Sequence, residues 1–441
     1  MKRKLLYIAT LVLLHAAGAW WFFGTIGEKG KPAVKIGAEA GFIGRQKTIS
    51  VVFSDKGQGL RHTEISITQD NIPHVLSTID YPDKNTATKK VALTIDTAAL
   101  KLHDGPAVIK ASAIDRSVWK NSTEIATPTQ IDLLPPQIYL QTAQNHINIG
   151  GAGVVSYNLS EPVSRTGVQA GDIFYPAYKT TLAGQEAYVA YFALPDEAPP
   201  GGGAWQIAAL AVDNAGNETL NTIPALIKKK KFHSDKIILS DDFLNRKMPE
   251  FQASLPELRG KTPLETFTII NTATRAANLK TIQAAGEKTE GRSLWNGPFL
   301  RMKDAAPRAF FGDRRTYFYN GRQISESVHN GVDLASLAHA SIQAANDGIV
   351  RFAGAIGIYG NSVIIDHGMG LSTLYSHMSS ILVKPEQTVK KGEAIGVSGM
   401  TGLAGGDHLH FGVAINGQFI DPVEWWDPHW IADNITKKLG Q

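Results

Sequence analysis

Residues 408–415 read His-Leu-His-Phe-Gly-Val-Ala-Ile, and this stretch decides the fold of the C-terminal part of the chain. Large apolar residues occupy every second position from Leu409 to Ile415, which is the pattern of a β-strand with one face in a core. His408 and His410 therefore lie together on the opposite face, which small residues leave uncrowded. Packing in a core explains one histidine, but a pair on one face indicates a site.

Two further segments place histidines beside polar groups: His329-Asn-Gly-Val-Asp333 and Tyr375-Ser-His377-Met378. Each is a weak signal in a chain with 13 histidines, but cysteine is absent, so any metal must be held by imidazoles and carboxylates. His329, Asp333 and His410 together offer two nitrogens and one oxygen, a donor set of catalytic zinc sites that keep one position for water. This set leaves His377 and His408 free to accept or donate protons beside the metal.

Four segments carry a family resemblance, in this order: HNGVDLA (329–335), YGNSVIIDHGMGLSTLYSHM (359–378), VKKGEAIGVSGMTGLAGGDHLHFGV (389–413) and DPVEWW (421–426). Over roughly residues 311–426 the chain resembles the lysostaphin-type, or LytM-like, zinc endopeptidases, which hydrolyse cell-wall peptides. The resemblance implies that His329, Asp333 and His410 bind zinc and that His377 and His408 are catalytic. It also implies a mainly antiparallel β fold with a narrow groove.

The chain departs from the family pattern at one position beside the site. Asp407 stands where the family commonly has proline, which affects the groove edge and removes no ligand. The family often uses an upstream tyrosine to stabilise the tetrahedral intermediate, and Tyr317 and Tyr319 are both candidates. Some relatives have lost ligands and act as activators of other wall hydrolases; this chain keeps all five positions.

Other polar residues of this part are expected to be structural. His367 has no ligand counterpart in the family, and we expect it to make hydrogen bonds within the sheet. Asp366 is expected to accept hydrogen bonds, and His339 and His429 have no supporting spacing. The many glycines between 392 and 406 lack a P-loop arrangement and predict turns.

A chain of 441 residues is too long for one core. Short alternating strands from about residue 33 to 231 predict two tandem β-sandwich modules, at 33–135 and 136–231, similar to the immunoglobulin-like modules of bacterial surface proteins. A weak repeat supports the pair: Ile109–Asp115 resembles Ile207–Asp213, and each precedes a turn with asparagine, Asn121 or Asn217.

A helical connector is predicted at 232–300, because Thr262 and Glu265 fit a capping box around Pro263. The zinc metallopeptidase domain is expected at 301–430, followed by a tail at 431–441. The predicted fold class is therefore mainly β. Because the upstream modules lack a recognisable catalytic set, a fragment starting near Leu300 is expected to bind zinc and cut.

Basic residues at positions 2 to 4 precede an apolar run from Leu5 to Phe23, so residues 1–30 are an export signal or a membrane anchor. Ala17-Gly18-Ala19 offers a cleavage site, but the length and the aromatic end of the run favour an uncleaved anchor. We expect a single pass through the inner membrane, with the C-terminal domains outside the cytoplasm. The net charge of +4 is too mild to indicate nucleic acid.

The function predicted from the sequence is a zinc-dependent endopeptidase that uses zinc-bound water to hydrolyse peptide crosslinks of bacterial peptidoglycan. One alternative is a cell-wall binding protein or activator of another wall hydrolase. A second is a non-haem iron enzyme, since two histidines and one carboxylate also form the iron-binding facial triad. The additional His377 and His408 disfavour the iron enzyme.

Overall fold

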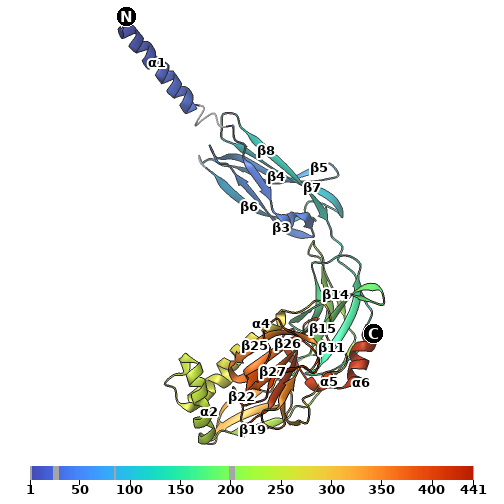
Figure 1. The fold of residues 1–441 in the computed structure, drawn as a ribbon. Coiled ribbons are helices and arrows are strands. Elements are labelled where there is room, and N and C mark those ends of the chain that lie inside the picture. Colours follow the sequence, from blue (N-terminus) through green and yellow to red (C-terminus); the bar gives the residue numbers. More distant parts are fainter. Residues whose placement is uncertain (1, 23–28, 84–85, 143, 198–203, 441) are drawn as a thin grey trace. The chain divides into compact units, whose positions relative to one another are not determined.

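The computed structural model describes residues 2–22, 29–83, 86–142, 144–197 and 204–440, and the chain divides into two compact units (Figure 1). The first unit holds residues 1–136 with 161–164 and 212–219. The second holds residues 137–160, 165–211 and 220–441. Strands dominate and most pair antiparallel, so the mainly β prediction is confirmed.

The N-terminal helix α1, Lys2–Trp21, contains most of the apolar run. Its described apolar side chains are exposed, among them Leu11, Leu14 and Trp20. No helix within the described residues is both long and apolar enough to cross a bilayer. The end of the run at Phe23 lies outside the described residues. The anchor stays a prediction.

The first unit contains two sheets around one apolar core. One sheet has the order β1 (Ala33–Ile36), β3 (Gln46–Ser54), β6 (Thr88–Asp96); the other has β2 (Phe42–Ile43), β8 (Ser122–Ile131), β7 (Gly105–Asp115), β4 (Leu60–Gln69), β5 (Ile72–Asp80). A short turn of helix, η2 (Ala38–Gly41), precedes β2. The alternating Ile65, Ile67 and Ile95 are fully buried, as their period of two predicts.

A second pair of sheets follows along the chain. One has the order β14 (Tyr178–Leu182), β15 (Gln185–Ala193), β11 (Ala152–Leu159), β9 (Ile138–Leu140); the other has β13 (Ile173–Pro176), β12 (Arg165–Ala170), β16 (Ile207–Val212), β17 (Glu218–Thr222). β10 (Asn145–Asn148) pairs with β18 (Ala225–Lys228).

The predicted repeat falls on β7 and β16 and has a structural counterpart in the turns that follow them. Asn121 Nδ2 donates to Asp115 Oδ2 at 2.8 Å, and Asn217 Nδ2 donates to Asp213 Oδ2 at 2.8 Å. Both turns therefore use the same asparagine-to-aspartate bond. The module boundaries and their likeness to immunoglobulin domains stay predictions.

An eight-stranded sheet forms the C-terminal part. Its order is β20 (Ala306–Ala309), β23 (Val332–Ala335), β31 (Leu409–Ile415), β27 (Leu371–Met378), β26 (Gly360–Gly368), β25 (Gly348–Ile356), β29 (Thr388–Val389), with β32 (Gln418–Ile420) paired to β31. Smaller sheets contain β24 (Ser341–Gln343), β30 (Ala394–Val397), β28 (Ser380–Ile381), and β19 (Ser234–Ile238), β21 (Arg314–Tyr319), β22 (Arg322–Val328). Short helices η5 (Gly357–Tyr359), α5 (Pro422–Trp426), α6 (Pro428–Ile431), η6 (Ala432–Thr436) and η7 (Lys437–Leu439) complete it.

The helices expected before this sheet are present as α2 (Asp241–Ser254), η3 (Pro256–Leu258), α3 (Pro263–Ile269), η4 (Ile270–Thr274) and α4 (Arg275–Glu287). The capping box is confirmed: Thr262 Oγ1 accepts from Glu265 N at 3.3 Å, and the Glu265 carboxylate accepts from Thr262 N at 2.8 Å. Pro263 occupies the first helical position, where its missing N–H costs nothing.

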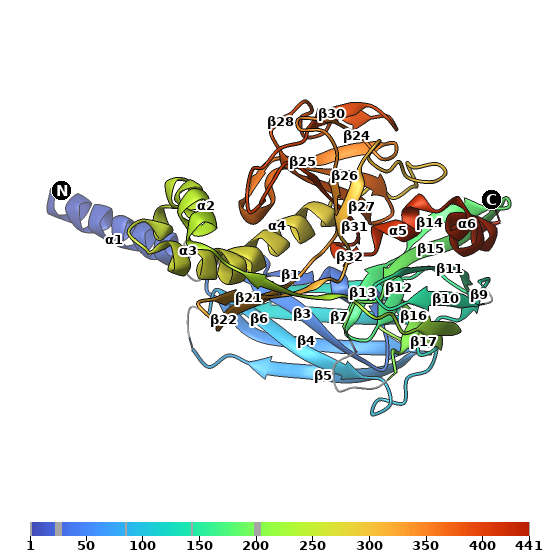
Figure 2. The ribbon, with the colours of Figure 1, turned by 90° about the horizontal axis from the view of Figure 1, so that it is seen from below.

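These helices share one core with the C-terminal sheet. Figures 1 and 2 show α4 beside β25 and β26. Eight buried apolar residues before position 300 belong to this core: Leu239, Leu244, Met248, Phe251, Leu258, Phe267, Ile270 and Ile282. They pack with residues of the sheet such as Ile364, Leu374 and Phe419. The connector is thus part of the hydrophobic interior around the site.

This shared core revises the expected behaviour of a fragment that begins at residue 300. Burying one large apolar side chain contributes about 1.5–3 kcal/mol, and domains are stable by only about 5–15 kcal/mol. We therefore expect fragment 300–441 to bind a hydrophobic dye and to lack a cooperative thermal transition, whereas fragment 137–441 melts cooperatively. Equal melting temperatures of the two fragments would contradict the structural role of residues 239–282.

Candidate active site

Three neighbouring strands bring the site residues together. Asp333 on β23 lies opposite His410 on β31 in the antiparallel register, and Ser376 on β27 faces His410 from the other side. His377 follows Ser376 directly and His408 precedes β31, so both imidazoles reach the same end of the sheet. Residues separated by as many as 81 positions are thereby placed within contact distance.

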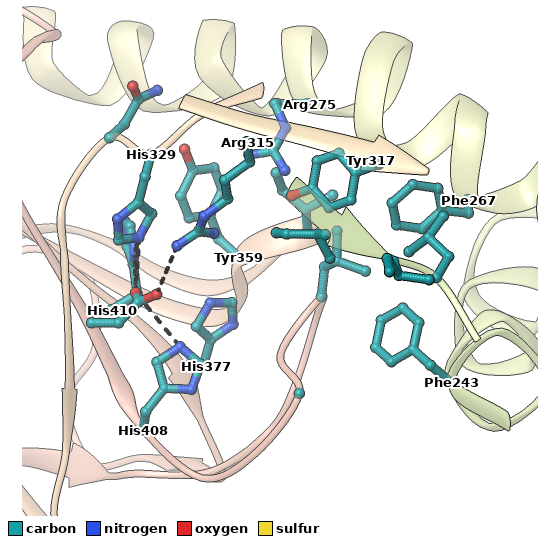
Figure 3. A pocket seen from close by; sticks show the side chains of 18 residues that line it. Phe243, Phe267, Arg275, Arg315, Tyr317, His329, Tyr359, His377, His408 and His410 are labelled. Carbon is teal, nitrogen blue, oxygen red and sulfur yellow. Dashed lines mark hydrogen bonds and ion pairs between the residues drawn. The ribbon is translucent and has the colours of Figure 1, made fainter. Parts of the chain in front are cut away.

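His329, Asp333 and His410 converge on one point (Figure 3). His329 Nε2 lies 2.9 Å from Asp333 Oδ1 and 3.0 Å from His410 Nδ1, and His410 Nδ1 lies 2.9 Å from Asp333 Oδ1. The side chains of the two histidines are 6% and 4% exposed, and that of Asp333 is 13% exposed. The surrounding protein therefore shields these three side chains from most of the solvent.

Hydrogen bonding around the cluster favours a bound cation. His329 Nδ1 lies 2.9 Å from the carbonyl oxygen of Phe310, which only accepts, so Nδ1 carries the proton and Nε2 presents a lone pair. Asp333 Oδ1, which only accepts, lies 2.9 Å from this lone pair, so a cation between the two atoms would relieve their repulsion. His410 places its Nδ1 at the same point, 3.0 Å from His329 Nε2, and its Nε2 is buried without a hydrogen-bond partner. Two imidazole nitrogens and one carboxylate oxygen are ligands that zinc accepts, so these residues fit a zinc ion.

His377 and His408 lie beside this cluster, with ring centroids 4.7 Å apart. His377 Nδ1 donates to the carbonyl oxygen of Thr401 at 2.8 Å, and His408 Nδ1 donates to that of Gly406 at 2.8 Å. Both bonds leave Nε2 directed away from the backbone, and His408 Nε2 is 3.6 Å from Asp333 Oδ1. His377 also has a left-handed backbone, with φ of 64°, which is strained for a residue with a side chain.

Burial and charge set different protonation preferences in the site. Burial lowers the pKa of His410 to about 4 and lowers the pKa of His377 well below its usual value, so both are neutral at pH 7. Burial acts against the charged form of Asp333 as well, yet His329 and the other histidines hold its pKa well below the ordinary range. Burial also opposes protonation of His408, but the attraction of the nearby Asp333 carboxylate prevails and raises the pKa of His408.

A cavity of about 390 Å³ opens on these residues. His329, Asp333, His377, His408 and His410 all line it, so the structure brings all five predicted residues to one place. One wall is apolar and comes from residues before position 300: Ile237, Ile238, Leu239, Phe243 and Phe267. This wall was absent from the sequence prediction, because its residues carry no motif.

The model of Peptidase family M23 matches residues 327–422 of the chain, the segment that contains the five residues. This part of the chain belongs to peptidase family M23. The predicted lysostaphin-type, LytM-like resemblance is thereby confirmed for the C-terminal domain.

Three relatives of the M23 domain differ in how much of each protein they share. DD-carboxypeptidase/endopeptidase Mpg of Neisseria meningitidis serogroup B is 43% identical over 96 residues, 22% of this chain and 22% of that protein. An "Uncharacterized metalloprotease" of Haemophilus influenzae is 34% identical over 200 residues, 45% of this chain and 40% of that protein. Murein hydrolase activator NlpD of Salmonella typhimurium is 35% identical over 102 residues, 23% and 27% respectively. The similarity thus spans less than half of each relative.

The two tyrosines that the sequence left open occupy different places beside the M23 site. Tyr317 lines the cavity and is buried, with its hydroxyl 3.3 Å from Ser327 Oγ. Tyr319 does not line the cavity and donates instead to Asp241 Oδ1 at 2.7 Å. Tyr359, which sequence reasoning missed, also lines the cavity, with its ring 5.5 Å from that of His410. The geometry therefore favours Tyr317 and Tyr359 over Tyr319.

Residues expected to be structural lie away from the cavity. His367 is fully buried, with Nδ1 2.7 Å from the carbonyl oxygen of Asp347 and Nε2 2.8 Å from Thr373 Oγ1. Asp366 accepts from Arg351 Nη2 at 3.1 Å. Asp407, at the position where the family commonly has proline, accepts from Ser398 Oγ at 2.6 Å and from the backbone N–H of His339. These bonds hold the loop that leads into His408.

Ligands and proton-transfer groups should respond differently to substitution. Removing a ligand removes the metal itself, so Asp333→Ala and His410→Ala should lose zinc and turnover together. His377→Ala and His408→Ala should keep nearly full zinc and lose about 10²- to 10⁴-fold in turnover, the usual contribution of acid-base catalysis. Metal content and turnover are to be measured on one preparation of each variant.

The exposed His429 provides a matched control, and His429→Ala should change neither quantity. Loss of zinc from His408→Ala with retention by His410→Ala would reverse the assignment within the pair.

Proposed function

We propose that this chain is a zinc-dependent endopeptidase that hydrolyses peptide crosslinks of peptidoglycan. The observation that carries the proposal is the convergence of His329 Nε2, Asp333 Oδ1 and His410 Nδ1, with His377 and His408 beside them in one cavity of an M23 domain. The names of the relatives support the substrate class, since Mpg is a DD-carboxypeptidase/endopeptidase and NlpD is a murein hydrolase activator.

His329, Asp333 and His410 would hold the zinc ion. When bound, zinc supplies Lewis acidity, which polarises a carbonyl and lowers the pKa of water to about 7. Asp333 stays ionised because the surrounding histidines favour its charge, and Arg315 Nη2 lies 3.4 Å from its second oxygen. The Nδ1 bond of His329 to Phe310 keeps its ring oriented with Nε2 toward the metal position.

His377 and His408 would move protons. His377 is neutral because of its burial, and its Nδ1 bond to Thr401 leaves Nε2 as the acceptor that takes a proton from the attacking water. His408 is the more easily protonated of the two, because Asp333 raises its pKa, and it is suited to give a proton to the departing amine. The hydroxyl of Tyr317 or Tyr359 would stabilise the developing oxyanion from the cavity wall.

Digestion of purified wall tests this proposal. The zinc-loaded chain should convert crosslinked muropeptides into monomers, each cleavage adding one water and creating one new amine and one new carboxylate. Mass spectrometry of the products identifies the bond. Chelation should abolish the reaction, zinc should restore it, and His377→Ala should remain inactive although it binds zinc. Oxygen-dependent turnover with bound iron would instead favour the facial-triad enzyme.

A second candidate function is activation of another wall hydrolase. The similarity to NlpD favours it, because that relative is named as an activator. The two candidates differ in their dependence on the ligands. A chain that cuts no muropeptide with zinc present, yet stimulates a second hydrolase equally well as Asp333→Ala, would support the activator.

We also propose that α1 anchors the protein and that the M23 domain works outside the cytoplasm. The support is the basic start and the apolar run of residues 5–23. The native protein should then sediment with membranes and require detergent for extraction, whereas salt or carbonate should not release it. A soluble native protein whose first residue is Trp20 would show a cleaved signal instead.

A further inference from the structure

The cavity beside the histidines has more positive than negative side chains. Arg275, at the first position of α4, and Arg315, on β21, both line it, and Asp333 is the one carboxylate among its lining residues within the described ranges. Arg315 is already paired with that carboxylate. A divalent cation held by Asp333 would add further positive charge to the cavity. Within the described residues no second carboxylate lines the cavity to balance it.

Arg275 is the less satisfied of the two guanidinium groups. Its Nη2 donates to Asn271 Oδ1 at 2.8 Å, whereas its Nε is buried without a hydrogen-bond partner. Among the described residues it forms no ion pair, in contrast to Arg315 and Arg351. A half-buried cation without a counter-charge has lost part of its hydration with no compensating attraction. An anion in the cavity would supply that attraction.

The surroundings of Arg275 fit an anion that is part of a larger substrate. Figure 3 shows Arg275 and Arg315 reaching into the cavity from the side opposite His377 and His408. Phe267 and Tyr317 stand beside them, with ring centroids 5.2 Å apart. Apolar neighbours exclude water and strengthen a charge pair formed there. If the scissile bond of a peptide lies at the histidines, the group that contacts the arginines must therefore be another part of the same peptide.

We infer that Arg275, supported by Arg315, forms a subsite for a free carboxylate of the peptide substrate close to the scissile bond. The inference rests on the proposed endopeptidase function and specifies a feature of its substrates. A guanidinium group is planar and donates two parallel hydrogen bonds to a carboxylate, which gives both affinity and orientation. Peptides that carry this carboxylate are the preferred substrates, and their amides are poor ones.

Two synthetic crosslinked peptides that differ only in one group test the subsite. One carries a free carboxylate on the residue that follows the scissile bond, and the other carries its amide. The wild-type enzyme should cleave the acid about 10- to 100-fold better in kcat/KM, the range expected for a charged hydrogen-bonded pair. Arg275→Gln should cleave the acid as slowly as the amide, while its rate on the amide stays within a few-fold of wild type.

Lys280 is an exposed cation on the same helix, so Lys280→Gln is the matched control and should keep the wild-type preference. Zinc content and melting temperature of Arg275→Gln report whether the site is intact. Binding of both peptides to the zinc-loaded His377→Ala protein, measured by calorimetry, gives a readout without turnover: the acid should bind more tightly, and the difference should vanish when Arg275→Gln is added.

Equal cleavage of acid and amide by the wild type would overturn the subsite and leave the endopeptidase intact. An equal decrease of kcat/KM on both peptides in Arg275→Gln would also overturn it, since Arg275 would then support the structure of the site and not recognise the carboxylate. Failure of the wild type to cut either peptide, or wall itself, would count against the proposed function.

Discussion

The charge of one buried carboxylate organises the site. Asp333 Oδ1 lies 2.9 Å from a nitrogen of His329 and of His410 and 3.6 Å from His408, while Asp333 Oδ2 faces Arg315. Isolated ionised carboxylates are costly to bury, and this one is tolerated because positive or metal-binding groups surround it. The orientations of these four side chains therefore depend on one group, as does the capacity of the cluster to hold a cation.

The M23 segment does not make its cavity alone. Its five histidine and aspartate positions lie on β23, β27 and β31, directly before β31 or, for His329, directly after β22. The facing wall comes from β19, α2 and α3, which precede the matched segment. Phe267 links the two parts, since it belongs to the shared core and lines the cavity. A change in the packing of these helices would therefore alter the apolar wall of the cavity without altering any proposed metal ligand.

Charge and polarity divide the cavity into regions with separate tasks. One side holds the proposed metal ligands and the two histidines proposed to move protons, and the opposite side presents arginine and tyrosine side chains next to an apolar wall. Under the proposed function, such a division would let one peptide be held by its flanking groups while its scissile bond lies at the metal. An anionic group of the substrate would give a counter-charge to Arg275, a partly buried cation that forms no ion pair among the described residues and whose Nε has no hydrogen-bond partner.

The local pattern of the sequence was sufficient to predict three features. They are the shared face of His408 and His410, the capping box at Thr262 and the similar turns at Asn121 and Asn217. Each of these depends on neighbours within a few residues, where periodicity and hydrogen-bonding chemistry act directly. The choice of Tyr317 over Tyr319, the place of Tyr359 and the arginines of the cavity depended on tertiary structure. Arg275 is separated from Asp333 by the rest of α4, a connecting segment and the three strands β20, β21 and β22, and only the packing of α4 against the sheet brings it to the cavity. Sequence alone determined which five residues are the candidates for the chemistry. The tertiary structure decided that they converge and which surfaces surround them, because long-range packing leaves no periodic signal along the chain.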